Sequence, residues 1–326
     1  MELRKKEGDS FENQGEKAMN RPEILGVGEV CVDWTALVDH FPNPDEKIDS
    51  KSQDIFGGGV TANYCVAAAR LGAKTGFFGA IGDDDYGNFL QKDFQQEGVD
   101  THFLFRMSEK STPVNIIVVN EQTGEKIIIQ SPYMHTTIPK MDSFSPHHLN
   151  NVKLVHSSGI FPELTANIFR EAAKQGIITS FDLEKQIAIW GLQKIKPILD
   201  YTQILLPNKA GAMQLTGTDN PEEAAQIFLD WGIKLVVITL GEGGAMAFTK
   251  EGKIHVPAYP VRVVDTTGAG DTFCGAFTYT YGIKKWSIKK ALRFGVAAAS
   301  LKLQKLGARS GMPTFASVEQ FITENA

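Results

Sequence analysis

The sequence has no long apolar run, few cysteines and no excess of basic charge, and each shortage excludes a class of protein. No stretch of its 326 residues approaches the roughly twenty apolar residues of a membrane span, so no membrane partner is expected. The formal net charge of −5 argues against DNA or RNA as a partner, because binding a polyanion normally needs clustered Lys and Arg. The three cysteines are far apart and lack paired metal-ligand spacing, which favours a reducing, cytoplasmic compartment.

Two patterns typical of other enzyme classes are incomplete. The seven histidines form no HxxxH or HxH pair, so a histidine metal site is not expected. Gly26-Val27-Gly28 opens like a dinucleotide fingerprint, but Cys31 stands where its third glycine belongs. A nicotinamide-dependent oxidoreductase is therefore disfavoured.

Alternating apolar segments predict an α/β fold with a mostly parallel central sheet covered on both faces. Strands are expected at residues 24–34, 152–158, 177–182, 204–206 and 235–240, and helices at 61–71, 163–175 and 187–199.

Three segments lie outside this rhythm. Residues 1–20 are polar and rich in Lys, Glu, Gly and Asn, and we expect a disordered tail before a single domain at 21–326. Segments at about 34–56 and 112–131 have strand-like patterns without covering helices. We expect them to form a small β-sheet lid over a cleft, and to mediate a homodimer that hides their strand edges.

The segment 261–277, VRVVDTTGAGDTFCGAF, carries the clearest chemistry. It predicts a strand that runs into Asp265 and then a helix that begins near Gly268-Ala269-Gly270. Small residues at a helix start leave backbone N–H groups open to an anion. Asp271, in the first turn, would then face the bound group as a proton acceptor. On its own, a GAGD turn with a helix-capping aspartate explains this pattern equally well.

The surrounding sequence resembles the ribokinase, or PfkB, family of carbohydrate kinases. Segment 265–277 is similar to the second signature of that family, and 57–72, GGGVTANYCVAAARLG, is similar to its first. The resemblance runs from about residue 24 to residue 313 in the family's motif order.

The resemblance implies a ribokinase-like three-layer α/β/α domain with a nine-stranded sheet and a β lid. It also implies phosphoryl transfer from ATP to a sugar hydroxymethyl group, with Mg²⁺ bound alongside the nucleotide. By position, Asp271 would be the general base, and the backbone of Gly268, Ala269 and Gly270 would hold the transferred group.

Sugar-binding positions follow from the same resemblance. Asp33, in GEVCVD, matches the aspartate that accepts hydrogen bonds from two sugar hydroxyls. Asn63 matches a residue that contacts sugar hydroxyls, and Gly58 and Gly59 lie in the same glycine run. Taken alone, Asp33 is more typical of a turn after a strand.

Nucleotide-binding positions are implied further along the chain. Thr239, Gly241 and Gly244 resemble the loop that contacts phosphates and ribose, besides Gly268 and Gly270. Asn208 matches the first residue of the family's Asn-x-x-Glu element near Mg²⁺, but Gly211 stands in place of the glutamate. Magnesium would then depend on waters, nucleotide oxygens or another carboxylate.

Asp265 and Thr267 match a monovalent-cation site that many members complete with carbonyls near Gly307 and Gly311. The resemblance thus leaves activation by K⁺ open.

The acceptor is expected to be an unphosphorylated sugar. Segment 57–63 has no Lys or Arg to bind a phosphate ester. Segment 38–73 resembles the ketohexokinase and sulfofructose kinase branches, which favours a ketohexose. Arg106, Lys126 and Lys185 are candidates for a distant cation that would admit an anionic substituent. The alternatives are a kinase of a nucleoside, pyridoxine or a sugar acid, and a sugar-sensing protein without catalysis.

Overall fold

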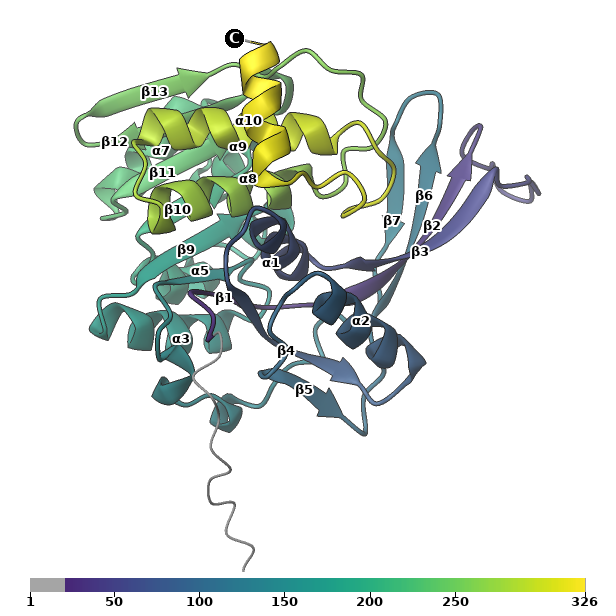
Figure 1. Cartoon of the computed structure of the whole chain (residues 1–326), viewed down its shortest axis with the longest axis horizontal. Coiled ribbons are helices and arrows are strands. Elements are labelled where there is room, and N and C mark those ends of the chain that lie inside the picture. Colours follow the sequence, from purple (N-terminus) through teal and green to yellow (C-terminus); the bar gives the residue numbers. More distant parts are fainter. Residues whose placement is uncertain (1–20, 326) are drawn as a thin grey trace, which may run out of the picture.

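The computed structural model describes residues 21–325, which form a large layered unit and a smaller sheet beside it (Figure 1). The predicted tail at 1–20 lies outside the described residues. None of the helices in the described range is long and apolar enough to cross a membrane.

Nine strands of the described chain form the main sheet, in the order β13-β12-β11-β10-β9-β8-β1-β4-β5. All neighbouring strands from β5 to β11 are parallel, and β12 and β13 continue the sheet in antiparallel pairing. The predicted mostly parallel α/β sheet is therefore confirmed. The strands are β1 Ile24–Val27, β4 Thr75–Gly82, β5 Leu104–Met107, β8 Leu154–Ser157, β9 Ile178–Leu183, β10 Ile204–Pro207, β11 Leu235–Thr239, β12 Ala245–Thr249 and β13 Gly252–Val256.

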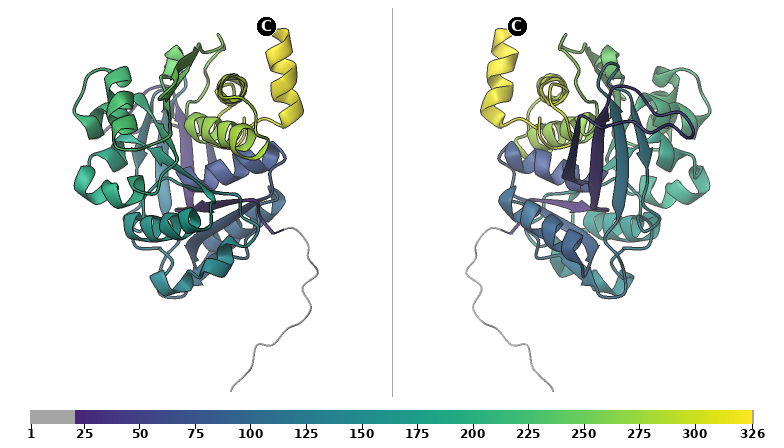
Figure 2. Two further views of the ribbon diagram at one scale, coloured as in Figure 1. Left: turned by 90° about the vertical axis from the view of Figure 1, so that its left-hand side faces the viewer. Right: turned by 90° about the vertical axis from the view of Figure 1, so that its right-hand side faces the viewer.

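Helices cover both faces of this sheet, and each face has its own apolar core (Figure 2). One layer contains α1 Val60–Arg70, α2 Asp85–Gln96, α8 Ala269–Thr278, α9 Ile288–Lys302 and α10 Phe315–Glu324. The other contains α3 Pro162–Lys174, α4 Lys185–Ala188, α5 Leu192–Leu199, α6 Lys209–Thr216 and α7 Pro221–Asp230.

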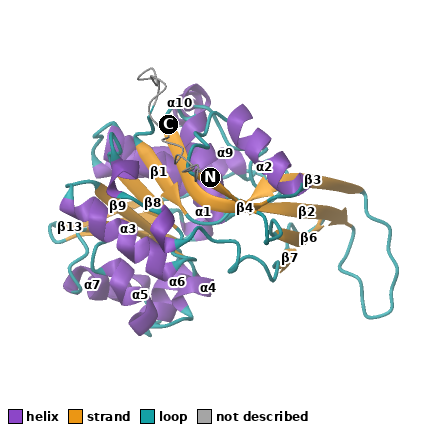
Figure 3. Cartoon of the chain, turned by 90° about the horizontal axis from the view of Figure 1, so that it is seen from below, coloured by secondary structure: helices purple, strands orange, loops and turns teal. Residues whose placement is uncertain are grey.

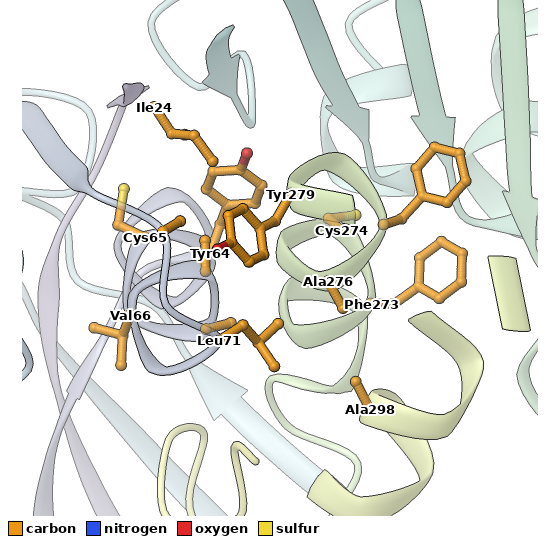
Figure 4. Close-up of a cluster of buried hydrophobic side chains, with 14 of the residues drawn as sticks. Ile24, Tyr64, Cys65, Val66, Leu71, Phe273, Cys274, Ala276, Tyr279 and Ala298 are labelled. Atoms are coloured by element: carbon orange, nitrogen blue, oxygen red, sulfur yellow. The ribbon is translucent and has the colours of Figure 1, made fainter. Parts of the chain in front are cut away.

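Helices α1 and α8 pack side by side, although about two hundred residues separate them in the sequence (Figure 4). At this contact Gly275 of α8 lies against α1, where a Cβ on it would be only 3.1 Å from Ala67 Cβ and from Ala68 N. Close packing of this kind restricts the movement of one helix relative to the other. The two family-like signatures therefore begin at adjacent helix N-termini.

The small sheet consists of β2 Cys31–Val38, β3 Ser52–Gly58, β6 Val114–Asn120 and β7 Lys126–Ile129, in the order β3-β2-β6-β7. It projects from the edge of the layered unit (Figure 3). Within the segment 112–131, whose strand-like pattern is confirmed, β6 and β7 pair antiparallel with Ile116 opposite Ile129.

Three predicted elements are wrong in detail. Residues 24–34 are not one strand: β1 ends at Val27, and the chain leaves the main sheet at Gly28 and enters the small sheet at Cys31. The helix predicted at 187–199 is broken by Gly191, whose φ of 80° is not helical. Residues 261–264 form no strand, since Val264 N–H bonds to Leu303 O in the loop after α9 instead of a sheet neighbour.

Candidate active site

Residues from distant parts of the chain meet in an open cavity of about 530 Å³ between the small sheet and the carboxyl ends of the main-sheet strands. Eight of the predicted site residues line it, namely Asp33, Gly59, Asn63, Asn208, Thr267, Gly268, Gly270 and Asp271. Six others lie outside its lining as far as residues 21–325 are concerned: Gly58, Thr239, Gly241, Gly244, Asp265 and Ala269.

The cavity opens where the strand order reverses, between β1 and β8, which is the usual ligand position in a parallel sheet. Glu29 follows β1 and receives hydrogen bonds from Val60 N (3.0 Å), Thr61 Oγ1 (3.2 Å) and Ser158 Oγ (2.7 Å). This buried carboxylate ties the ends of β1 and β8 to the start of α1. Sequence reasoning missed it because its partners are remote in the chain.

The start of α8 has the geometry of an anion cradle. Gly268 has a φ of 79°, and a Cβ on it would lie 2.2 Å from Ala308 O, so only glycine fits there. A Cβ on Gly270 would meet nothing within 4 Å, which leaves this turn open toward the cavity. The first N–H groups of a helix have no intrahelical partner and are available to a bound anion.

Asp271 lies in the first turn of α8, with its carboxylate directed toward α1. Asn63 Nδ2 donates to Asp271 Oδ2 at 2.8 Å, and Asn63 Oδ1 accepts from Arg309 Nε at 2.8 Å. Because Arg309 can only donate, it fixes which end of the Asn63 amide faces the aspartate. The hydrogen bonds thus orient one oxygen of Asp271 and leave the other for a ligand.

The environment of Asp271 changes its acidity. Burial, followed by the negative charge of Glu184, raises the pKa of Asp271 from 3.8 to about 8, while the bond from Asn63 opposes the shift. A carboxylate with a pKa near neutrality is a suitable proton acceptor for a hydroxyl group.

A second polar group faces the cavity from the small sheet. Asp33 Oδ1 accepts from Asn115 Nδ2 at 3.0 Å and from Cys31 Sγ at 3.4 Å, and burial raises the pKa of Asp33. A Cβ on Gly58 would lie 2.2 Å from Asp33 Oδ2, so the glycine run is needed for this side chain to fit. The alternation of side chains along β6 puts Asn115 and Ile116 on opposite faces of the small sheet. Asn115 reaches Asp33 because β6 pairs with β2, which places the two residues directly opposite each other.

Asn208 caps α6 by accepting from Gly211 N–H at 2.6 Å. A Cβ on Gly211 would lie 2.2 Å from Leu183 O and 3.0 Å from Glu184 C, so no glutamate side chain fits there. The backbone that occupies this space carries Glu184, which lines the cavity with Asn208 and has a pKa raised by burial. A carboxyl group therefore lines the cavity beside Asn208, although position 211 itself has none.

The donor set suits a magnesium ion carried by a nucleotide better than one held by the protein alone. No group of three or more His, Cys, Asp or Glu side chains within residues 21–325 could form a metal cage. Mg²⁺ commonly keeps several waters and binds through substrate phosphates and one or two carboxylates. Glu184 and Asn208 both line the cavity and have side-chain oxygens of the kind that would suit that role.

Asp265 and Thr267 lie just before the cradle. Asp265 Oδ1 accepts from Thr267 N (2.8 Å) and Thr267 Oγ1 (2.7 Å), and Oδ2 accepts from Gly307 N (2.8 Å). Lys126 of β7 reaches across the cavity, and its Nζ donates to Thr267 Oγ1 at 3.0 Å. This contact joins the small sheet to the segment that leads into α8.

The remaining predicted residues form the neighbouring strand ends. Asn208 and Thr239 form an isolated parallel bridge beyond β10 and β11. Gly241 and Gly244 bound a short 3₁₀ turn after β11, both with positive φ. Neither glycine lines the cavity. Of the proposed cations, Lys126 and Lys185 line the cavity, whereas Arg106 bonds to Asn88 and Gln91.

Comparisons with known proteins agree with this geometry. Residues 21–315 match the pfkB family carbohydrate kinase family. The chain is 30% identical to a ribokinase from Haemophilus influenzae (93% of this chain, 99% of the relative) and 27% identical to a 5-dehydro-2-deoxygluconokinase from Geobacillus kaustophilus (93% and 94%). An ATP-dependent 6-phosphofructokinase from Thermoanaerobacterium thermosaccharolyticum is 29% identical (91% and 92%).

Solved structures show the same fold. Ribokinase from Thermotoga maritima superposes with a TM-score of 0.78 at 31% identity, covering 93% of this chain and all of that one. Ribokinase from Arabidopsis thaliana, complexed with ribose and ATP, gives 0.78 at 25% identity, with 92% and 98% covered. Fold, signatures and relatives agree that the chain belongs to the pfkB family of carbohydrate kinases, phosphotransferases with an alcohol group as acceptor.

Proposed function

We propose that this kinase transfers the γ-phosphoryl group of ATP to a primary hydroxyl of an unphosphorylated sugar, a ketohexose in the first place, with Asp271 as general base. The observation that carries this proposal is the oriented Asp271 carboxylate beside the open start of α8, facing the Asp33–Asn115 pair across one cavity. ATP as donor is supported by the Arabidopsis thaliana relative, which is complexed with ribose and ATP.

In this mechanism Asp33 and Asn115 bind the sugar hydroxyls and place the reacting hydroxyl against Asp271. Asp271 accepts the hydroxyl proton as the hydroxyl oxygen attacks the γ-phosphorus atom of ATP, and the bond from that phosphorus to the β,γ-bridging oxygen breaks to release ADP. The N–H groups at the start of α8 stabilise the charge on the transferred group, and Lys126 supplies a further positive charge nearby. Bound Mg²⁺ would supply charge neutralisation of the phosphates, with Glu184 and Asn208 as its side-chain contacts.

The charge of the cavity favours a neutral sugar. Its lining has four acidic side chains, Glu29, Asp33, Glu184 and Asp271, against two lysines, Lys126 and Lys185, so a phosphate ester on the acceptor would meet more negative than positive groups. Arg309 is not free to bind a phosphate ester, because its guanidinium already donates hydrogen bonds to Asn63, Asp93 and Gly58 O.

The deciding experiment is a coupled assay of kcat/KM for fructose, ribose, fructose 6-phosphate, adenosine and pyridoxine. We expect fructose or a related ketose to be the best acceptor. A preference for fructose 6-phosphate by about tenfold or more, equal to 1.4 kcal/mol, would show that the charge argument is wrong.

A sugar acid is the second candidate, favoured by the lysines that line the cavity. Lys126 and Lys185 both do so, and 5-dehydro-2-deoxygluconokinases are among the similar relatives. If the acceptor carries a carboxylate, Lys126→Met raises its KM while leaving the KM for neutral sugars nearly unchanged. Lys153→Met, at an exposed lysine paired with Glu23, is the matched control.

We also propose that the small sheet is a lid and that its outer face joins a second copy of the chain. Trp34 lies directly opposite Ile55 on one side and Ile116 on the other, and Ile116 lies opposite Ile129. These four side chains cross the whole sheet and are 45–58% exposed. A continuous apolar row of this kind on a β-sheet is typical of an interface, and a symmetric second copy offers an equal row.

A further inference from the structure

Lys302, the last residue of α9, has a fully buried charged side chain outside the cavity. Its side chain has 0% exposure. Nζ donates to Asp265 O at 3.0 Å and to Lys305 O at 3.2 Å, and lies 3.9 Å from Asp265 Oδ2. Lysine is almost never fully buried without compensating groups, so this arrangement needs a reason.

The ammonium group joins two segments that build the anion cradle. The first is 265–267, which leads directly into Gly268. The second is the loop 303–311, whose Ala308 presses against Gly268 and whose Gly307 N–H bonds to Asp265 Oδ2. Lys302 bonds to a carbonyl in each, so its position fixes their separation.

Two carbonyl oxygens and a nearby carboxylate around a dehydrated positive charge also make up the surroundings of a bound monovalent cation. Here a covalently attached ammonium supplies the charge. We infer that Lys302 is a built-in cation: it positions the Gly268–Gly270 cradle, takes the place of a bound K⁺ or NH₄⁺, and makes transfer independent of added monovalent cations. It is a positioning residue, and the inference rests on the proposed transfer at Asp271.

The charge state of Lys302 is consistent with this role. Burial lowers its pKa to about 8, and the negative charge of Asp265 limits the fall. The side chain is therefore mostly protonated at neutral pH. Both carboxylate oxygens of Asp265 already accept hydrogen bonds, from Thr267 and from Gly307 N–H. They are therefore poorly placed to bind a second cation.

The first test needs no variant. Activity is compared in KCl and in tetramethylammonium chloride, each at about 0.1 M so that charge screening is equal. We expect kcat to agree within about twofold, which is less than 0.5 kcal/mol. Activation by K⁺ of about fivefold or more, or a K⁺-dependent rise in the melting temperature, overturns the inference.

The second test replaces the charge. Lys302→Met keeps most of the side-chain volume but leaves three oxygens without a cation. We expect kcat to fall at least about tenfold, less than the 10²–10³-fold loss seen when a direct oxyanion donor is removed. K⁺ or NH₄⁺, but not tetramethylammonium, should restore part of kcat and raise the melting temperature of this variant.

Lys305→Met is the matched control, because Lys305 contributes only its carbonyl oxygen and its side chain is exposed. It should behave as wild type in every salt. If Lys302→Met loses stability and no small cation restores stability or kcat, Lys302 serves packing alone and the inference fails. The melting-temperature measurements need no substrate, so they test Lys302 even if the proposed acceptor or the role of Asp271 is wrong.

Discussion

Replacing Asp271 by asparagine should remove catalysis and at the same time stabilise the fold. The two side chains have nearly the same shape, and the amide oxygen of asparagine can still accept the 2.8 Å hydrogen bond from Asn63 Nδ2. Only the proton acceptor is lost. Removal of a general base commonly lowers kcat by about 10²–10⁴-fold, which corresponds to about 3–5 kcal/mol of transition-state stabilisation.

The stability effect follows from the pKa of Asp271, which rises from 3.8 to about 8 on folding. An acid with a raised pKa disfavours the folded state above its unfolded pKa, and this cost grows until the pH passes the folded pKa. At about 1.4 kcal/mol per pH unit, the cost at pH 7 reaches several kcal/mol. Asparagine avoids it, and after partial relaxation we expect a gain of about 1–3 kcal/mol, or a melting temperature about 2–6 °C higher.

The assay combines steady-state kinetics with thermal unfolding at pH 5 and pH 8. The gain in melting temperature should be larger at pH 8, where ionisation of Asp271 is most costly. Asp182→Asn is the matched control: Asp182 is buried in the same acidic cluster with a raised pKa but does not line the cavity, so this variant should keep its activity. If Asp271→Asn keeps a third of kcat, or unfolds at a lower temperature at pH 8, the reasoning is refuted.

Three further predictions concern the sugar site, the pH profile and the small sheet. Asp33→Ala should lower kcat/KM for the best acceptor by more than about fivefold, or 1 kcal/mol, because a buried hydrogen-bond acceptor is lost; a change within threefold places the sugar elsewhere. Glu184→Gln should move the acid limb of the kcat/KM profile to lower pH, because the charge of Glu184 raises the pKa of Asp271 and the base must be unprotonated; a limb that stays in place or moves upward contradicts this. Ile116→Glu should convert a dimer of about twice 35.7 kDa into a monomer in sedimentation, whereas Trp231→Glu, at the exposed aromatic residue that follows α7, should not; a monomeric wild type rejects the interface.

The sequence was sufficient for features that depend on local pattern. Apolar runs flanked by glycine predicted the parallel strands, and the small residues before Asp271 predicted an open helix N-terminus. The structure contains both the parallel strands and the open helix N-terminus, because each of these features depends on residues that are close together in the sequence. The expected strand at 261–264 failed for the opposite reason: its valines are apolar, but Val264 bonds to the loop after α9.

Features that depend on long-range pairing could not be predicted in this way. Arg309 looks like an ordinary charged residue, yet it bonds to Asn63 and Asp93. Glu184 takes on importance only because the backbone at 183–184 fills the space beside Gly211. The role of Lys302 could not be predicted from the sequence, because the carbonyl groups that it contacts, Asp265 O and Lys305 O, come together only in the folded protein.

The separation of the catalytic parts along the chain has a consequence for synthesis. Asn63 bonds to Asp271 across 208 residues and to Arg309 across 246. A nascent chain that has emerged from the ribosome only as far as α7 contains Asp33 and Asn63 but neither the cradle nor the base. Such long-range contacts form late, because loop closure must precede them. Phosphoryl transfer is therefore withheld until the last part of the chain has docked, and incomplete translation products should consume no ATP.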